Sequence, residues 1–166
     1  MPRVGIAVGS NLGDRLAHLQ AACACLREIA LPGEPFLQAA IYQTAPRFCP
    51  PGSPFFYNSV AEIGFGGTPS ELLEITQAIE KKIGRDPVHI RNAPRIIDMD
   101  LLYFGSQIID TEALVLPHPR LIERRFVLQP LAEICPHLVL PGFEKSIGQL
   151  LDQLQSEEPA LVPVAS

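Results

Sequence analysis

Apolar residues recur every three or four positions in three segments of the chain, and this spacing predicts one buried face of an α-helix. The segments cover residues 16–29, 72–83 and 147–154. The second follows Thr68, Pro69 and Glu71, the residue types of a helix N-terminus closed by a capping box. A fourth apolar segment, residues 126–134, carries Pro130, and we expect it to break there.

Short apolar runs bounded by Gly, Pro and polar residues predict β-strands at residues 4–8, 36–42, 55–65 and 94–105. Residues 107–109 are expected to fold back on the last of these strands as a hairpin partner. The order strand, helix, strand, strand, helix, strand is the α+β ferredoxin-like pattern, an antiparallel sheet with helices packed on its faces. We expect a single domain over residues 1–166, with a core at about 4–154 and a frayed tail at 156–166.

Two carboxylates, Asp98 and Asp100, interrupt the strand at 94–105, which we call the aspartate strand. Alternation along a strand places them on one face, roughly 7 Å apart, followed there by Leu102 and Phe104. The other face is apolar: Ile97, Met99, Leu101 and Tyr103. Two neighbouring anions repel each other unless a cation lies between them, and Mg²⁺ bound by carboxylates and substrate phosphates is such a cation. A strand end with two solvated acids is the alternative, and the pair alone leaves both open.

Positive charge gathers around the aspartate strand. Residues 81–125 hold eight of the 13 basic residues and six of the 18 acidic ones, so this segment carries +2 and the rest of the chain −7. The overall charge of −5 argues against a general nucleic-acid-binding protein. Most cations of the segment are arginines, whose planar fork suits phosphate, although a solvated loop surface is an alternative. They are Arg85, Arg91, Arg95, Arg120, Arg124 and Arg125.

The remaining composition is that of an ordinary globular protein, with 47% hydrophobic residues. No apolar run reaches the roughly 18 residues of a membrane span and no signal-peptide pattern opens the sequence, so we expect a cytoplasmic protein. The four cysteines show no CxxC spacing, and Cys23 and Cys25 fall on one predicted helix, too close to pair readily. Reduced thiols are therefore favoured over disulfides or a zinc site.

Two irregular segments have the composition of loops, and loops of this length are often functional. They are residues 44–54, with four prolines, and the basic residues 85–93. Three further positions could bind a ligand or be purely structural, and the pattern leaves both readings open. They are Asn58 beside Phe56 on one strand face, Gln77 with Glu80 on one helix face, and His118 between two prolines.

Six motifs follow one another between Gly9 and Leu131, within a resemblance that runs from about Val4 to Leu154. They are Gly9-Ser10-Asn11-Leu12-Gly13-Asp14, Tyr42-x-Thr44-x-Pro46, Asn58-x-Val60, Pro94-Arg95-x-Ile97-Asp98-x-Asp100-Leu101-Leu102, Leu116-Pro117-His118-Pro119-Arg120-Leu121 and Arg125-Phe126-Val127-Leu128-x-Pro130-Leu131. The ordered set resembles the 6-hydroxymethyl-7,8-dihydropterin pyrophosphokinases of folate biosynthesis. Its most specific part is the Arg-x-x-Asp-x-Asp run.

The resemblance implies a single ferredoxin-like domain, a monomer, that transfers the diphosphoryl group of ATP to the hydroxymethyl group of the dihydropterin and releases AMP. Its partners would be these two small molecules, with neither nucleic acid nor membrane. Two Mg²⁺ ions, held by Asp98 and Asp100, would neutralise the phosphates and align the hydroxyl. The loops at 44–54 and 85–93 would close over the substrates and exclude water.

The resemblance also implies roles for single residues. On the nucleotide side, the phosphate contacts are Arg85, Arg95, Arg124 and His118, with Gln77 and Glu80 lining the site. The expected catalytic set is Arg85, Arg95, Asp98 and Asp100. On the pterin side, the expected contacts are Phe56 and Phe126 as stacking rings, Asn58 at the pterin edge, backbone groups of Thr44 and Ala45, and Asp98.

The chain departs from the pattern of these pyrophosphokinases at three places. The segment with Cys49-Pro50-Pro51 is about one residue longer than in a well-known relative. Asn92-Ala93 stand where relatives commonly carry Trp-Gly, so a bulky aromatic is missing from the closing loop. Pro87 stands where some relatives carry Arg, a charge that Arg91 or Arg120 could supply. Two alternatives stay open: another Mg²⁺-dependent phosphoryl or nucleotidyl transferase, against which the aromatic and amide residues argue, and a non-catalytic pterin- or nucleotide-binding relative, which would be expected to have lost the aspartates.

Overall fold

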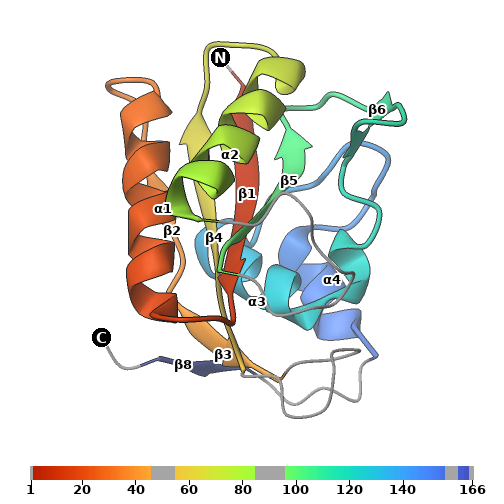
Figure 1. Ribbon diagram of the computed structural model, residues 1–166. Helices are drawn as coiled ribbons and strands as arrows, with labels where there is room; N and C mark the ends of the chain where they lie inside the picture. The colour runs from red at the N-terminus through yellow and green to blue at the C-terminus, as the bar shows by residue number, and fades with distance from the viewer. Residues whose placement is uncertain (1, 46–54, 85–95, 156–160, 165–166) are drawn as a thin grey trace.

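The computed structural model describes residues 2–45, 55–84, 96–155 and 161–164. An antiparallel sheet forms the centre of this part of the chain (Figure 1). Its strands are β1 (Arg3–Ser10), β2 (Leu37–Gln38), β3 (Tyr42–Thr44), β4 (Phe56–Gly64), β5 (Asp98–Phe104) and β8 (Val162–Pro163). They lie in the order β5-β1-β4-β3-β8, with β2 paired to β4. The order, with β1 between β5 and β4, confirms the predicted α+β ferredoxin-like sheet.

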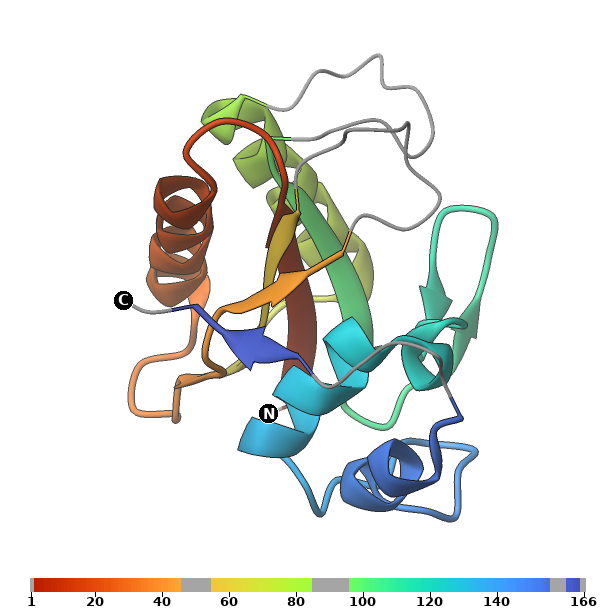
Figure 2. The ribbon, with the colours of Figure 1, turned by 90° about the horizontal axis from the view of Figure 1, so that it is seen from below.

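Helices cover both faces of the sheet (Figure 2). On one face lie α1 (Arg15–Ile29) and α2 (Pro69–Ile83); on the other lie α3 (Arg125–Ile134), α4 (Ile147–Gln153) and a 3₁₀ turn, η1 (Leu121–Glu123). Strand alternation gives each face its own apolar core. Val4, Ile6 and Val8 of β1 enter the core under α1 and α2, whereas Val60 of β4 enters the core under α3. We call the second side the α3 face.

The helix N-termini follow the local sequence signals. The Thr68 hydroxyl accepts from the Glu71 N–H, and the Glu71 carboxylate accepts from the Thr68 N–H, so the predicted capping box is confirmed. Such a cap is worth about 1 kcal/mol of helix stability. The Asp14 carboxylate caps α1 by accepting from the N–H of Ala17 at 3.1 Å.

A β-bulge in β5 corrects the predicted alternation of the aspartate strand. Ile6 of β1 is opposite Leu101, but Gly5 is opposite Tyr103, so Leu102 is an extra residue in β5. Leu102 and Tyr103 therefore both lie on the α3 face, and Phe104 lies in the core under α1 and α2. The expected faces of Tyr103 and Phe104 are wrong, whereas those of Asp98 and Asp100 precede the bulge and are unaffected.

The predicted hairpin partner of β5 is also wrong. Residues 109–110 form β6 (Ile109–Asp110), which pairs with β7 (Val115–Leu116) in a separate two-stranded sheet. The outer edge of β5 is already engaged: the Met99 N–H donates to the Glu80 carboxylate at 2.8 Å, and the Leu102 carbonyl accepts from the His118 N–H at 2.8 Å. Because these bonds occupy main-chain groups at this edge, a neighbouring strand cannot form a regular hydrogen-bond ladder with β5 there.

Three further expectations needed correction. The strand predicted at 36–42 consists of two pieces, β2 and β3. Pro130 lies inside α3, which continues through it; a proline in mid-helix lacks only its own N–H bond when its neighbours can accommodate the ring. Of the tail predicted to fray, the described residues 161–164 instead place β8 beside β3, and the Gln129 side chain bonds both the N–H and the carbonyl of Leu161, at 3.0 and 3.3 Å.

The thiols follow the prediction where the structure describes them. Cys23, Cys25 and Cys135 are free, and Cys49 lies outside the described residues. Burial raises the pKa of the Cys23 thiol to about 11, so this side chain is protonated at neutral pH and behaves as a small apolar core residue.

Candidate active site

The predicted metal and pterin residues lie in rows that cross the α3 face of the sheet. Tyr42 is opposite Asn58, Asn58 is opposite Gly9, and Gly9 is opposite Asp98. Strands lie about 4.8 Å apart, so the backbones of Asn58 and Asp98 are roughly 10 Å from each other. Gly9, which has no side chain, lies between them and leaves room above β1 for the Asn58 amide.

The neighbouring row repeats this arrangement with the second carboxylate. Ala7 lies between Val60 and Asp100 and contributes only a methyl group to this row. Asp98 and Asp100 are both partly exposed on this face. The structure therefore brings the two carboxylates together on one face, as the sequence predicts.

The expected pterin residues of β3 and β4 are held by one another. Asn58 is 7% exposed, and its Nδ2 donates to the Thr44 hydroxyl at 2.7 Å. Its Oδ1 leans over β1, because a Cβ placed on Gly9 would lie 2.6 Å from it. Phe56 is opposite Thr44 and, by alternation, shares the face of Asn58, while Ala45 follows β3 at the surface. Asn58 is thus a fixed group, with its amide orientation set by Thr44.

The start of α3 brings an aromatic ring and a cation to the same face. Phe126 packs against the core under α3, and the Arg124 guanidinium lies 5.4 Å from the centre of its ring. Within the described part of the chain, Arg124 makes no salt bridge to a carboxylate. The charge of Arg124 is therefore available to an anionic ligand.

His118 lies close to this group and is held through its backbone and its ring. The Leu116–Pro117 peptide before it is cis, and its Nδ1 accepts from the Arg120 N–H at 3.1 Å. That bond leaves Nε2 to carry the proton of the neutral ring. Burial, with the charges of Arg124 and Arg120, lowers the pKa of His118, against a smaller opposing effect of Asp98. The ring is therefore a neutral donor in the free protein.

Gln77 and Glu80 differ in environment although they were expected to share a helix face. Gln77 is exposed, whereas Glu80 is 6% exposed and accepts from the Met99 N–H, between the two aspartates. Glu80 is thus a buried support of β5.

Several predicted positions lie outside the described residues. Arg85 and Arg95 are among them, as are most of the loop at 44–54, the loop at 85–93, and the family departures at Pro87 and Asn92-Ala93. Their expected roles stay predictions.

The structure adds one residue behind the site, on the other face of β4, that the sequence analysis missed. Arg15, the first residue of α1, reaches β4, where its Nη1 donates to the Phe55 carbonyl at 2.6 Å and its guanidinium lies 4.1 Å from the centre of the Tyr57 ring. A basic residue in the first turn of a helix opposes the helix dipole, and this unfavourable position is the feature of the sequence that could have indicated a special role for Arg15.

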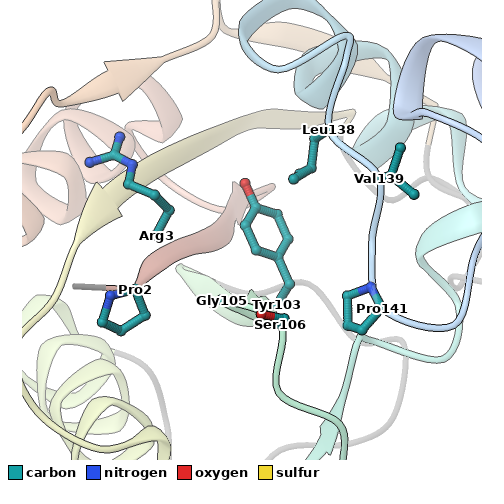
Figure 3. Close-up of a pocket in the computed structure, with 8 residues that line it drawn as sticks. All are labelled: Pro2, Arg3, Tyr103, Gly105, Ser106, Leu138, Val139 and Pro141. Carbon is teal, nitrogen blue, oxygen red and sulfur yellow. The ribbon is translucent and has the colours of Figure 1, made fainter.

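A cavity of about 350 Å³ lies at the other end of β5 (Figure 3). It is lined by Pro2, Tyr103 and Leu138 among others, about 20 Å along the strand from Asp98. The Tyr103 hydroxyl donates to the buried Glu62 carboxylate, which also accepts from Arg3 Nε at 3.0 Å. The cavity is therefore separate from the candidate active site. Beside it, Arg3 Nη1 is buried without a hydrogen-bond partner among the described residues, and the Glu34 carboxylate lies 4.0 Å away.

A model of the 7,8-dihydro-6-hydroxymethylpterin-pyrophosphokinase (HPPK) family matches residues 5–136. The chain belongs to this family. The matched range contains the two aspartates, Asn58, Phe126 and the other described residues of the site, so the HPPK family and the geometry concern the same part of the chain.

Individual relatives agree with this assignment. The 2-amino-4-hydroxy-6-hydroxymethyldihydropteridine pyrophosphokinase of Bacillus subtilis is 45% identical over 130 residues, which are 78% of this chain and 76% of that protein. The protein of the same name from Synechocystis sp. is 36% identical over 160 residues, 96% of this chain and 79% of that protein. The folic acid synthesis protein fol1 of Pneumocystis carinii is 37% identical over 152 residues, but this chain spans only 20% of its length.

Solved structures share the fold. The HPPK-DHPS protein of Plasmodium falciparum with SDX-DHP superimposes with a TM-score of 0.71 at 14% identity, covering 92% of this chain and 44% of that one. Within the described ranges, the HPPK chain has no helix with the length and apolar character needed to cross a bilayer.

Proposed function

We propose that this chain transfers the diphosphoryl group of ATP to the hydroxymethyl group of 6-hydroxymethyl-7,8-dihydropterin, forming AMP and the pterin diphosphate for folate synthesis. The observation that carries the proposal is the row Asn58, Gly9, Asp98 across the α3 face, in a chain of the HPPK family. This row supports the proposal because an amide suited to a flat heterocycle and a carboxylate pair suited to a metal–phosphate group share one sheet face, on strands whose backbones are roughly 10 Å apart.

Asp98 and Asp100 fit a magnesium site of the kind completed by substrate. In the described residues, no group of three or more His, Cys, Asp or Glu could hold a metal ion, so these two carboxylates would need phosphate oxygens and water to complete the coordination. Mg²⁺ is commonly bound in this way. Two bound Mg²⁺ ions would neutralise charge on the phosphates and draw the β-phosphoryl group and the hydroxyl into line.

The nucleotide side is proposed to consist of cations and neutral donors. His118 Nε2–H and the Arg124 guanidinium would contact phosphate oxygens, together with Arg85 and Arg95 from the family pattern. Gln77 would lie beside the nucleotide. Glu80 is proposed to act there too, and its bond to the Met99 N–H keeps the peptide between the two aspartates in place.

The pterin side is proposed to be a slot between two rings. Phe56 and Phe126 would stack on the two faces of the heterocycle, worth about 0.5–1.5 kcal/mol for each ring beyond the burial of area. Asn58 and the backbone around Thr44 and Ala45 would bond its polar edge. Because Thr44 fixes the amide of Asn58 before the substrate arrives, little ordering cost remains at this edge on binding.

We propose that residues 1–166 are one domain that works as a monomer in the cytoplasm on two small molecules, without nucleic acid. The net charge of −5 argues against nucleic acid as a partner. The use of site residues from β1 to α3, around one sheet, supports a single domain.

Product analysis tests the function. Purified protein is mixed with ATP, Mg²⁺ and 6-hydroxymethyl-7,8-dihydropterin, and the nucleotides are separated. We expect AMP in step with pterin diphosphate, and neither product without Mg²⁺. ADP in place of AMP would identify a simple kinase, and pterin binding without any nucleotide turnover would identify a non-catalytic relative; either result would refute the proposal.

A further inference from the structure

Arg15 joins the first turn of α1 to the first residues of β4. Its Nη1 donates to the Phe55 carbonyl at 2.6 Å, and its guanidinium lies over the Tyr57 ring, 4.1 Å from the ring centre. Both contacts join the helix to the strand, and the two hydrogen-bonded residues are 40 positions apart in the sequence. One side chain therefore fixes a main-chain oxygen and an aromatic ring of the same strand.

The two contacts lie on either side of Phe56. Tyr57 packs toward the core under α1 and α2, and alternation turns Phe56 toward the α3 face, where Thr44 and Asn58 lie. A strand residue whose two neighbours are held has little freedom to rotate its own Cα–Cβ direction. Arg15 therefore holds both neighbours of Phe56 from the opposite face of the sheet, without reaching the pterin side itself.

The position of Arg15 is unfavourable for the helix that carries it. A cation in the first turn opposes the helix dipole, whereas Arg27 in the last turn of the same helix is favoured. Arg27 also lies 4.1 Å from an aromatic ring, that of Phe36. The same residue type makes the same stacking contact at both ends of α1, and only the contact at the unfavourable end is next to the candidate active site.

We propose that Arg15 is a positioning residue of the pterin site, which holds Phe55 and Tyr57 so that the ring of Phe56 is fixed before the pterin stacks on it. The inference rests on the proposed function, because it takes Phe56 as a pterin contact. Arg15 touches neither reacting group, so its loss acts on pterin binding and leaves the chemical step in place.

The test compares Arg15→Gln with Arg27→Gln. Both remove one positive charge and one stacking contact from α1, and only the first is next to Phe56. For Arg15→Gln we expect the KM for the pterin to rise about tenfold, since a bond from a charged donor and a cation–π contact are both lost. The KM for ATP and kcat should stay within about twofold. Arg15→Lys keeps the charge without the planar fork and should fall between Gln and wild type.

Hydrogen exchange of a peptide covering residues 55–59 gives a second result that does not depend on activity. Faster exchange is expected in Arg15→Gln, and unchanged exchange in Arg27→Gln. Unchanged exchange and unchanged pterin KM in Arg15→Gln, or equal pterin effects in the two Gln variants, would overturn the positioning role even if the wild type makes AMP. A wild type that makes no AMP would instead refute the proposed function, and the exchange comparison would still decide whether Arg15 holds the start of β4.

Discussion

Replacing Gly9 by Ala tests the pterin side of the site, because the new methyl group would displace the Asn58 amide. Gly9 has no left-handed φ, so alanine brings no backbone strain. Its new methyl group would lie 2.6 Å from Asn58 Oδ1, where ordinary contact begins at 3.4 Å. The amide must therefore retreat by roughly 0.8 Å, more than its 2.7 Å bond to the Thr44 hydroxyl can absorb.

The size of the effect follows from that lost bond. Leaving a buried amide unsatisfied, or overpacking a buried contact, costs about 1–3 kcal/mol of unfolding free energy. For a chain of this size this corresponds to a fall of roughly 2–12 °C in Tm. Because the same amide is the proposed pterin contact, affinity for the pterin should fall about tenfold or more, since each 1.4 kcal/mol is a factor of ten.

Urea unfolding measures the first effect and calorimetric titration with the pterin the second. Gly5→Ala is the matched control on the same strand, because its methyl group would lie 2.3 Å from the Tyr103 ring, at the end of the sheet away from the site. Gly5→Ala should be the less stable variant and keep its pterin affinity. A Gly9→Ala protein with stability within about 0.5 kcal/mol of wild type and unchanged pterin affinity would refute the reasoning.

Three other changes test the remaining parts of the site and the fold. Asp98→Asn and Asp100→Asn should each abolish turnover while retaining a folded protein by circular dichroism, and substantial turnover in both would remove the metal assignment. The pKa of His118 is lowered in the folded state, so its contribution to stability is present above its unfolded pKa of about 6.5 and is lost as the pH falls toward the lower folded value. An NMR titration, with His118→Gln to assign the signal, should show the ring titrating below 6.5, and a value above 6.5 would contradict this. Deleting residues 161–166 removes the bonds to Gln129 and the Val164 N–H bond to the Ile41 carbonyl, and should lower the unfolding free energy by about 1–2 kcal/mol in urea; a loss above about 4 would mean that β8 is part of the core.

Local signals in the sequence predict the elements that depend on local chemistry. The Thr68–Glu71 capping box, the long helices and the faces of Asp98 and Asp100 follow from neighbouring residues alone. The α+β sheet follows from the order of the elements. The cap, the helices and the strand faces are decided by residue spacing within a few positions, where physical periodicity is strongest.

The missed features depend on partners far away in the chain. No glycine or proline marks the bulge at Leu102, which follows from pairing with β1. The separate pairing of β6 reflects the engagement of the β5 edge by Glu80 and the His118 N–H. Likewise, β8 depends on Gln129, which looks from the sequence like any polar residue of an apolar helix. Arg15 was overlooked for the same reason, because its contacts are with β4.

The bulge in β5 also decides where the length of this strand can change. Removing Leu102, the extra residue, would make Gly5 and Ile6 face consecutive residues of β5, and every remaining side chain of the strand would keep its face. Removing Met99 instead would make Asp98 and Asp100 consecutive, and consecutive residues of a strand point to opposite faces. The spacing of the two aspartates is therefore the part of β5 that cannot shorten without separating the carboxylates.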